Sequence, residues 1–343
     1  MSVYLKIIYY VTDHGLGHST RAVAIIRELI KNNVEVIIRN NDDLGFFKKS
    51  LPGTKVFHGC TDFKPVMKKI HPFRFSEIKT KKNMSLWVST LHQNISHEIQ
   101  FLKKHQPDFI ITDSSFMPIL AANKNQIRSI LLSNFVWSDS LLLSHKMEKF
   151  IHNSYSKADL VLQLIFGTKM KFKNKIKIGF VSRKPTVSKD KFRKSLGIKK
   201  NEKLVILSLS GMAKIPLNYS KNIKIIDISD YSNLKSSKLK NLVEGQNLIN
   251  AADLVICKCG FGFITECLSN GVKFCYIIDS KHKEAQGIHL ELKKLGLNQN
   301  ITLNFLSKSF INNKFINNFS RKKILPSNTL VVKKIIQFYE KNL

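Results

Sequence analysis

Acidic side chains are scarce in this chain of 343 residues: 24 Asp and Glu stand against 56 Lys and Arg, a formal net charge of +32. Such an excess favours contact with nucleic acid, anionic lipid or a polyanionic substrate. The lysines are spread along the whole chain, however, without an aromatic RNA-binding motif, zinc-finger spacing or a separate basic tail. Dedicated nucleic-acid binding is therefore disfavoured. Attraction to an anionic membrane face or polyanionic substrate stays a hypothesis, with compositional bias as its alternative.

Long apolar runs are also missing. No window of 18 residues is apolar throughout, so the sequence predicts no membrane-spanning helix. The opening MSVYLKIIYYVTD has one lysine, no long apolar segment and no small-residue cleavage site, which favours a first strand over a signal peptide. We therefore expect a cytoplasmic protein that is at most peripheral at the inner face of a membrane.

Cysteine is rare and odd in number, with five residues, four of which lie between Cys257 and Cys275. An odd count without a secretion signal favours free thiols in a reducing compartment over a disulfide framework. The spacing contains no Cys-x2-Cys pair, and the four residues fall on different expected elements. Small buried thiols are therefore favoured over a metal site.

Strand and helix patterns alternate through the first half. Runs rich in β-branched and aromatic residues predict strands at 3–12, 34–40, 109–113, 129–135 and 158–165. Apolar periodicity predicts helices at 18–33, 85–108 and 117–124. Ser19 or Thr20 is the expected cap of the first helix. This alternation is typical of a parallel sheet covered by helices.

A charged stretch at 169–203 separates this half from a second α/β series. Strands are predicted at 203–211, 222–229, 251–260 and 273–278, and an amphipathic helix at 328–342. The expected architecture is α/β, with two Rossmann-like parallel-sheet domains facing a central cleft. We place an acceptor-side domain at 1–178 and a nucleotide-sugar-binding domain at 179–326. A C-terminal helix at 327–343 is expected to pack back on the first domain.

The loop DHGLGHST follows the first expected strand, at the sheet edge where ligands bind in open α/β folds. Gly15 and Gly17 permit left-handed turns and close approach of a ligand. His18 can take a proton from a hydroxyl group if a carboxylate orients its ring. Asp113 ends a buried strand at the same edge and is the natural partner. The structural alternative is that His18 packs or caps and Asp113 caps the next helix; His14 is less well placed.

The same loop bears some likeness to a dinucleotide-binding turn. That fingerprint needs a third glycine where Thr20 stands and an acid where Arg39 stands. Arg39 suits a 2′-phosphate instead, so an NADP-dependent oxidoreductase remains an alternative.

A second glycine-containing loop, CKCGFGFITECLSNG, begins at Cys257. Gly260 and Gly262 are expected in the loop, with a helix from near Phe263. Backbone amides and the helix dipole would form a diphosphate cradle without a metal. Glu266, one turn into the helix, can accept hydrogen bonds from a ribose diol. The structural alternative is an ordinary turn with an acid favourable to the helix dipole.

These residues carry a resemblance. The segment 257–287 resembles the donor-site signature of the GT-B glycosyltransferases, in the branch of the peptidoglycan lipid-linked N-acetylglucosaminyltransferase and the plant-type UDP-sugar transferases. The first loop resembles the Gly-His loop of that family, and the segment around Asp113 resembles the one that supplies the plant-type aspartate. The resemblance covers nearly the whole chain in order.

The resemblance implies a GT-B fold and transfer of a sugar from a nucleoside diphosphate sugar, UDP-sugar foremost, to an acceptor hydroxyl. It implies His18 as base and Asp113 as its partner. The donor-binding residues that it implies are Arg183, Ser210, Gly211, Gly260, Phe261, Gly262, Thr265, Glu266, Glu284 and Gln286. The acceptor-side loop that it implies contains His14, Gly15 and Gly17. No further cofactor is expected, and the expected acceptor is lipid-linked or a cell-envelope glycan.

The chain contains no Asp-x-Asp motif, so a metal-bridged diphosphate is not expected, and direct displacement with one base would invert the anomeric carbon. Two alternatives remain. A nucleotide-sugar epimerase or hydrolase on the same fold would use no acceptor other than water. A basic surface-binding protein with a degenerate site would bind no nucleotide.

Overall fold

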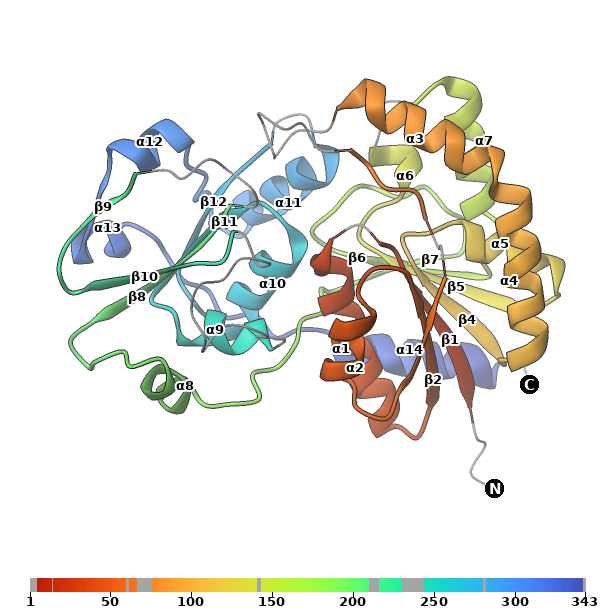
Figure 1. Cartoon of the computed structure of the whole chain (residues 1–343), viewed down its shortest axis with the longest axis horizontal. Coiled ribbons are helices and arrows are strands. Elements are labelled where there is room, and N and C mark those ends of the chain that lie inside the picture. Colours follow the sequence, from red (N-terminus) through yellow and green to blue (C-terminus); the bar gives the residue numbers. More distant parts are fainter. Residues whose placement is uncertain are drawn as a thin grey trace. The chain divides into compact units, whose positions relative to one another are not determined.

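The computed structural model describes residues 5–13, 15–59, 62–66, 76–140, 143–209, 216–229, 244–279 and 282–341. The chain forms two compact units, coloured along the sequence in Figure 1. Unit 1 is made of Met1–Val66, Phe75–Val181 and Ser327–Leu343, and unit 2 contains Ser182–Pro326. The chain leaves unit 1 after Val181 and returns to it at Ser327.

Unit 1 is built on a seven-stranded sheet in the order β3-β2-β1-β4-β5-β6-β7, in which all neighbours are parallel. The strands are β1 (Lys6–Val11), β2 (Glu35–Asn40), β3 (Lys55–His58), β4 (Phe109–Asp113), β5 (Arg128–Ser133), β6 (Leu160–Leu164) and β7 (Lys175–Ile178). Val11 pairs with Asp113, and Tyr10 with Arg39, so β1, β2 and β4 end at one edge. The loops that follow these strands therefore share that edge.

Eight helices are described in unit 1: α1 (Leu16–Lys31), α2 (Leu44–Ser50), α3 (Glu77–Ser89), α4 (Leu91–His105), α5 (Met117–Lys124), α6 (Trp137–Ser140), α7 (His145–Tyr155) and α14 (Asn328–Glu340). α14 contacts α1 (Figure 1), and its Phe338 ring lies 5.7 Å from the ring of Phe109 at the start of β4. The backbone N–H of Ser327 donates to the carbonyl of Phe180 at 2.7 Å, which fixes the start of this returning segment.

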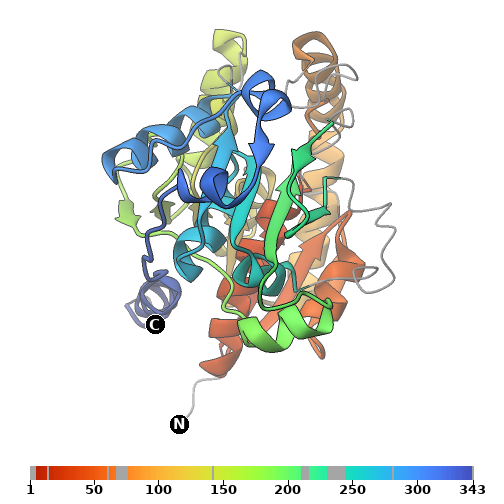
Figure 2. The same cartoon turned by 90° about the vertical axis from the view of Figure 1, so that its left-hand side faces the viewer.

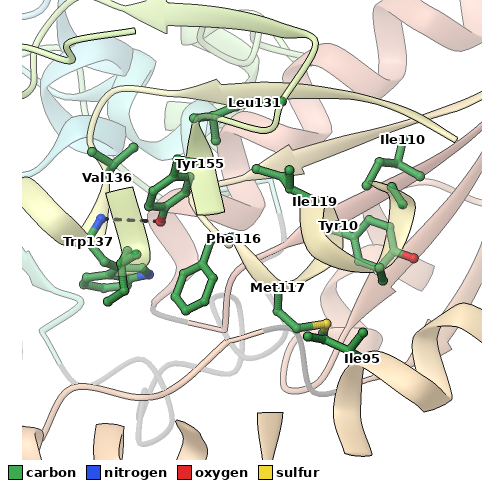
Figure 3. Close-up of a cluster of buried hydrophobic side chains, with 14 of the residues drawn as sticks. Tyr10, Ile95, Ile110, Phe116, Met117, Ile119, Leu131, Val136, Trp137 and Tyr155 are labelled. Carbon is green, nitrogen blue, oxygen red and sulfur yellow. Dashed lines mark hydrogen bonds between the residues drawn. The ribbon is translucent and has the colours of Figure 1, made fainter. Parts of the chain in front are cut away.

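One face of this sheet carries an aromatic core, shown in Figure 3. Because successive strand residues point to opposite faces, Ile8 and Tyr10 of β1 enter this core together. The contacting residues from the helices and loops include Ile95, Phe116, Met117, Ile119, Val136, Trp137 and Tyr155. Each fully buried side chain of this size contributes about 1.5–3 kcal/mol. α1 is absent from the cluster but contacts β1 and β2, so it covers the opposite face.

Unit 2 is built on a parallel sheet in the order β10-β8-β11-β12, visible in green to light blue in Figure 2. Its strands are β8 (Lys203–Ser208), β10 (Ile223–Asp227), β11 (Leu254–Lys258) and β12 (Phe274–Ile277), and a separate pair joins β9 (Asn218–Tyr219) to β13 (Phe310–Ile311). Its helices are α8 (Lys189–Ser195), α9 (Gly245–Ala251), α10 (Phe261–Asn270), α11 (Lys283–Lys294), α12 (Leu303–Lys308) and α13 (Asn313–Asn317). Both units have the predicted parallel α/β architecture.

Several local expectations are wrong. The helix predicted at 85–108 is two helices, α3 and α4, which meet at Thr90. The backbone N–H and the hydroxyl of Thr90 both donate to the carbonyl of Trp87. These two hydrogen bonds accompany the end of α3 at Ser89. The edge strands β3 and β7 were not predicted, because their alternation lies in four residues that include lysines.

The described residues bear on two composition-based expectations, those on cysteine and on membrane spans. The four cysteines from Cys257 to Cys275 are free and buried, and burial raises the pKa of the Cys257 thiol to about 12. Cys60 lies outside the described residues. Within the described ranges, no helix combines the length and the apolar character that a membrane span requires.

Candidate active site

The loop after β1 turns directly into α1. Gly15 has a φ of 80° and precedes the helix, which begins at Leu16, so Gly17 and His18 lie in its first turn. The expected cap is wrong: Ser19 donates to the carboxylate of Asp43, and Thr20 donates to the carbonyl of Gly17. A Cβ added at Gly15 or Gly17 would meet no atom within 4 Å, so this turn has open space beside it. His14 lies outside the described residues.

The predicted His18–Asp113 pair is in contact. Nδ1 of His18 lies 2.9 Å from Oδ1 of Asp113. The two side chains come from α1 and from the end of β4, and only 7% of His18 is exposed. The ring of Phe135 packs edge-on against the His18 ring, with centroids 5.5 Å apart. The imidazole is therefore held on one side by a carboxylate and on another by an aromatic edge.

Arg21 is part of the same cluster and was missed in the sequence. Its Nε donates to Oδ2 of Asp113 at 2.6 Å, and its Nη2 donates to Oδ1 of the same carboxylate. Its Nη1 donates to the amide oxygen of Asn134. A signal was present, because three residues after His18 is one helix turn, and an arginine there shares the buried face of the helix.

The Arg21 charge decides the ionisation of Asp113. Burial alone would raise the pKa of Asp113, but the Arg21 guanidinium, then His18, and the hydrogen bonds from both bring it down to about 2. Asp113 is thus an anion at any physiological pH. It is shared between a permanent cation and the imidazole.

The backbone beneath this cluster is strained at two positions. Ser114, directly after Asp113, has a φ of 61°, and Phe166 has a φ of 65°. Asn134 Nδ2 donates to the carbonyl of Phe166 at 2.8 Å. A Cβ on Gly167 would come within 1.8 Å of the Asn134 carbonyl oxygen. Left-handed non-glycine residues cost about 1–3 kcal/mol each and concentrate at functional sites.

Further carboxylates lie at the same edge. Burial raises the pKa of Asp13 to about 6, although the backbone N–H of Asn41 donates to it at 2.7 Å. Burial raises the pKa of Asp62 to about 8, although Trp137 Nε1 donates to it at 2.6 Å. At neutral pH the Asp62 carboxyl is therefore largely protonated, whereas Asp113 at the same edge is an anion.

The position of Arg39 removes the reason for an NADP site. Its Nε donates to Glu98 at 2.9 Å and its Nη2 at 2.5 Å, and its guanidinium carbon lies 3.8 Å from the ring centroid of Phe101. Both charged side chains are buried. The guanidinium is already paired with Glu98 in the interior and is therefore not positioned to bind a 2′-phosphate.

In unit 2, the second glycine-containing turn follows β11. α10 begins at Phe261 after the Gly260 cap, so Gly262 lies in the first helical turn and not, as expected, in the loop. The N-cap residue Gly260 has no side chain with which to cap this helix. The hydroxyl of Thr265 donates to the carbonyl of Phe261 at 2.8 Å, within the helix. The Thr265 hydroxyl is therefore bonded within α10.

Two predicted donor residues are bonded to each other. Nε of Arg183 donates to Oε1 of Glu266 at 2.8 Å, and both side chains are buried. Burial raises the pKa of Glu266, whereas the charge and hydrogen bond of Arg183 lower it. Ser210 and Gly211 lie outside the described residues.

The remaining predicted donor residues, Glu284 and Gln286, lie in the first turn of α11. His282 caps this helix, accepting the N–H of Ala285 at 3.3 Å. Lys258, which the sequence analysis did not select, ends β11 beside the Gly260 turn. Burial lowers the pKa of Lys258, while the charge of Glu284 raises it. Lys258 and Glu284 are thus close enough to interact electrostatically within unit 2.

Comparison with known proteins decides between these chemistries. Residues 5–175 match the family model described as glycosyl transferase family 1. The N-terminal half of the chain thus matches a glycosyltransferase family. The matched residues run from β1 to the start of β7 and contain His18, Arg21 and Asp113.

Solved structures extend the likeness of this glycosyltransferase to the rest of the chain. MurG from Acinetobacter baumannii is 12% identical and aligns with a TM-score of 0.53, over 97% of this chain and 99% of that one. A UDP-glucosyltransferase from Polygonum tinctorium is 9% identical and aligns with a TM-score of 0.57, over 87% and 85%. These likenesses confirm the predicted GT-B fold.

A curated relative of the glycosyltransferase is the L-arabinokinase of Arabidopsis thaliana, 25% identical over 299 residues. The match covers 80% of this chain and 28% of that protein. The glycosyltransferase thus corresponds to just over a quarter of this relative.

We expect Asp113→Asn to destabilise the glycosyltransferase at pH 7 by about 2 kcal/mol or more, because Arg21 loses a buried partner. The folded pKa of Asp113, about 2, lies below its ordinary value of 3.8. The carboxylate therefore contributes its stability above about pH 4 and loses it as the pH falls through 2. Urea denaturation at a series of pH values should show the difference from wild type shrinking over that range.

Glu35→Gln is the matched control, because Glu35 pairs with Lys55 at an exposed position of the same unit. We expect it to change the stability by less than about 1 kcal/mol. The lowered pKa of Asp113 is contradicted if the difference in unfolding free energy between wild type and Asp113→Asn stays constant down to pH 2.

Proposed function

We propose that this glycosyltransferase moves a sugar from a nucleoside diphosphate sugar, UDP-sugar foremost, to an acceptor hydroxyl group. The observation that carries the proposal is the contact of 2.9 Å between His18 Nδ1 and Asp113 Oδ1 at the ligand-binding edge of the sheet. A histidine held by a buried carboxylate is the arrangement that activates hydroxyl nucleophiles in other enzymes.

In the proposed reaction, His18 accepts the proton of the acceptor hydroxyl on Nε2 while Nδ1–H donates to Asp113. The hydroxyl oxygen forms a bond to the anomeric carbon as the bond to the diphosphate breaks. The electron pair of that bond leaves with the diphosphate, and one direct displacement inverts the anomeric centre. The Asp113 carboxylate stabilises the imidazolium that forms.

On the donor side, we propose that the first turn of α10 receives the diphosphate. The backbone amides at the start of a helix and the helix dipole favour an anion, which suits a reaction without a bridging metal. Glu266 would accept hydrogen bonds from the ribose diol, with Arg183 keeping its carboxylate oriented. Glu284 and Gln286, in the first turn of α11, would contact sugar hydroxyls.

A thermal-shift screen against UDP, GDP, TDP and their sugars tests the proposal. A bound nucleotide at about 100 times its Kd adds about 2.7 kcal/mol of stability, so we expect a clear rise in Tm for one base. Glu266→Ala should weaken this shift and raise the donor KM. No shift with any nucleotide would favour the surface-binding alternative, and an unchanged donor KM in the variant contradicts the ribose role.

We expect His18→Ala to lower turnover about 10²–10⁴-fold, because the proton acceptor is lost, while the nucleotide-induced shift persists. His92→Ala, at an exposed position of α4, is the control and should retain turnover. Loss of nucleotide binding together with turnover would reject the base role. Release of free sugar, or of an epimer, without an added acceptor would instead favour the hydrolase or epimerase alternative.

We further propose that the enzyme works in the cytoplasm, at the inner face of a membrane, on a lipid-linked or cell-envelope acceptor. The buried free thiols suit a reducing compartment. α3 exposes 83% of Ile78 and 58% of Leu86, next to Lys79, Lys81 and Lys82. Exposed apolar side chains among lysines are suited to an anionic lipid surface.

Flotation with phosphatidylcholine vesicles, with and without phosphatidylglycerol, tests this membrane contact. We expect binding only to the anionic vesicles, and weaker binding after joint replacement of Ile78 and Leu86 by Ser. The control replaces Leu290 and Leu325, which are exposed in unit 2, by Ser. Equal loss in both double variants, or no binding to anionic vesicles, contradicts the proposal.

A further inference from the structure

We propose that Arg21 is a positioning residue that fixes the protonation pattern of His18 by acting through Asp113. It rests on the proposed role of His18 as base. In this arrangement Nδ1 carries the ring hydrogen, and Nε2 carries none and can accept the proton of the acceptor hydroxyl. Arg21 itself touches no substrate; its guanidinium decides which ring nitrogen is the base.

The hydrogen-bond inventory of Arg21 supports this pattern. Nη2 lies 2.8 Å from Nδ1 of His18, close enough to donate to it. However, Nη2 has two hydrogens, and oxygen acceptors are available for both: Oδ1 of Asp113, and the Ser114 hydroxyl at 3.1 Å. Because a guanidinium only donates, Nδ1 is left to donate its own hydrogen to Asp113, 2.9 Å away.

The competing pattern is chemically distinct. If Nη2 donated to Nδ1, the ring proton would lie on Nε2, and His18 could not accept a proton there. Oδ1 of Asp113 would then lose the Nδ1–H donor at 2.9 Å. The two patterns therefore differ in which nitrogen carries the hydrogen, which nitrogen NMR measures directly.

Charge reinforces the positioning. Among the described residues, the charged groups facing His18 are Arg21 on its own helix, Asp113 at the end of β4, and Asp43, which follows β2. Arg21 engages both oxygens of Asp113, so it offsets the carboxylate that would otherwise hold an imidazolium. A fixed cation this close also disfavours a second positive charge on the ring.

The surroundings hold the guanidinium in place. Asn134 accepts from Nη1 and is itself bonded to the carbonyl of Phe166. Ser114 and Ser133, whose hydroxyl oxygens are 2.6 Å apart, line the other side. The left-handed backbone at Ser114 and Phe166 lies directly beneath these contacts. Strain on both flanks of one guanidinium is consistent with a geometry kept for function.

Nitrogen-15 NMR of the histidine side chains across a pH series tests the proposal, with His18 assigned by its absence from His18→Ala. In the wild type we expect a neutral form with the hydrogen on Nδ1. In Arg21→Met the protonation midpoint should move up by at least one pH unit, a tenfold change in the equilibrium. In Arg21→Lys, which keeps the charge but not the fork, we expect a smaller shift and both neutral forms.

Arg39→Met is the matched control, because Arg39 forms a buried fork with Glu98 in the same unit but on the aromatic-core side. It should leave the His18 titration unchanged. The proposal is overturned if wild-type His18 carries its neutral hydrogen on Nε2, or if Arg39→Met shifts the midpoint as much as Arg21→Met. It is also overturned if folded Arg21→Lys titrates like wild type with one neutral form.

Enzyme kinetics separate this proposal from the function on which it rests. Where a donor is turned over, Arg21→Lys should lower kcat and move the acid limb of its pH profile, with the donor KM unchanged because unit 2 holds the donor. If no nucleotide sugar is bound or turned over, the proposed function fails, while the NMR result still decides whether Arg21 sets the proton position.

Discussion

A buried pair of opposite charges organises unit 1. Transferring Arg21 and Asp113 out of water costs several kcal/mol for each ion, and only good geometry with further hydrogen bonds compensates. The fork from Arg21 to both oxygens of Asp113 supplies that geometry, and Asn134 supplies a third contact. Because the three residues come from α1, β4 and the end of β5, the pair fixes three elements against one another. The position of His18 follows from it.

Buried pairs of an arginine and a carboxylate occur at two further places in the protein. Arg39 forks onto Glu98 on the aromatic side of unit 1, and Arg183 bonds Glu266 inside unit 2. A chain with 24 acidic residues against 56 basic ones thus uses some of its few acids internally, each against an arginine. Arginine suits this use better than the more abundant lysine, since its planar fork matches a carboxylate. The excess positive charge is left to the surface lysines.

The sequence was informative where local pattern determines structure. The buried run FIITD folds as β4 over the predicted residues, because five consecutive buried positions leave no alternative face. The first residue of α10 was harder to predict, since Gly262 lies in the helix, whereas glycine usually indicates a loop. β7 could not be recognised in the sequence, because its alternating lysines resemble the charged residues on either side of it.

The candidate site shows the same division. His18 and Asp113 were identified because each sits at a recognisable strand or helix end. Arg21 was not, because its partner lies 92 positions away and its spacing of one helix turn from His18 was the local signal that was missed. Likewise, Arg183 and Glu266 were selected singly, but their bond across 83 positions is a property of the fold. Pairing over such distances follows from topology, which residue pattern alone does not specify.

The route of the chain has a consequence for synthesis on the ribosome. α14 packs on α1, and its aromatic residues reach Phe109 at the start of β4. Every residue of unit 2 from Ser182 to Pro326 is translated before α14 emerges. Until then α1 lacks a neighbour on which it packs in the finished protein. Unit 1 can therefore complete its folding only after unit 2 has been synthesised, when α14 becomes available to pack on α1.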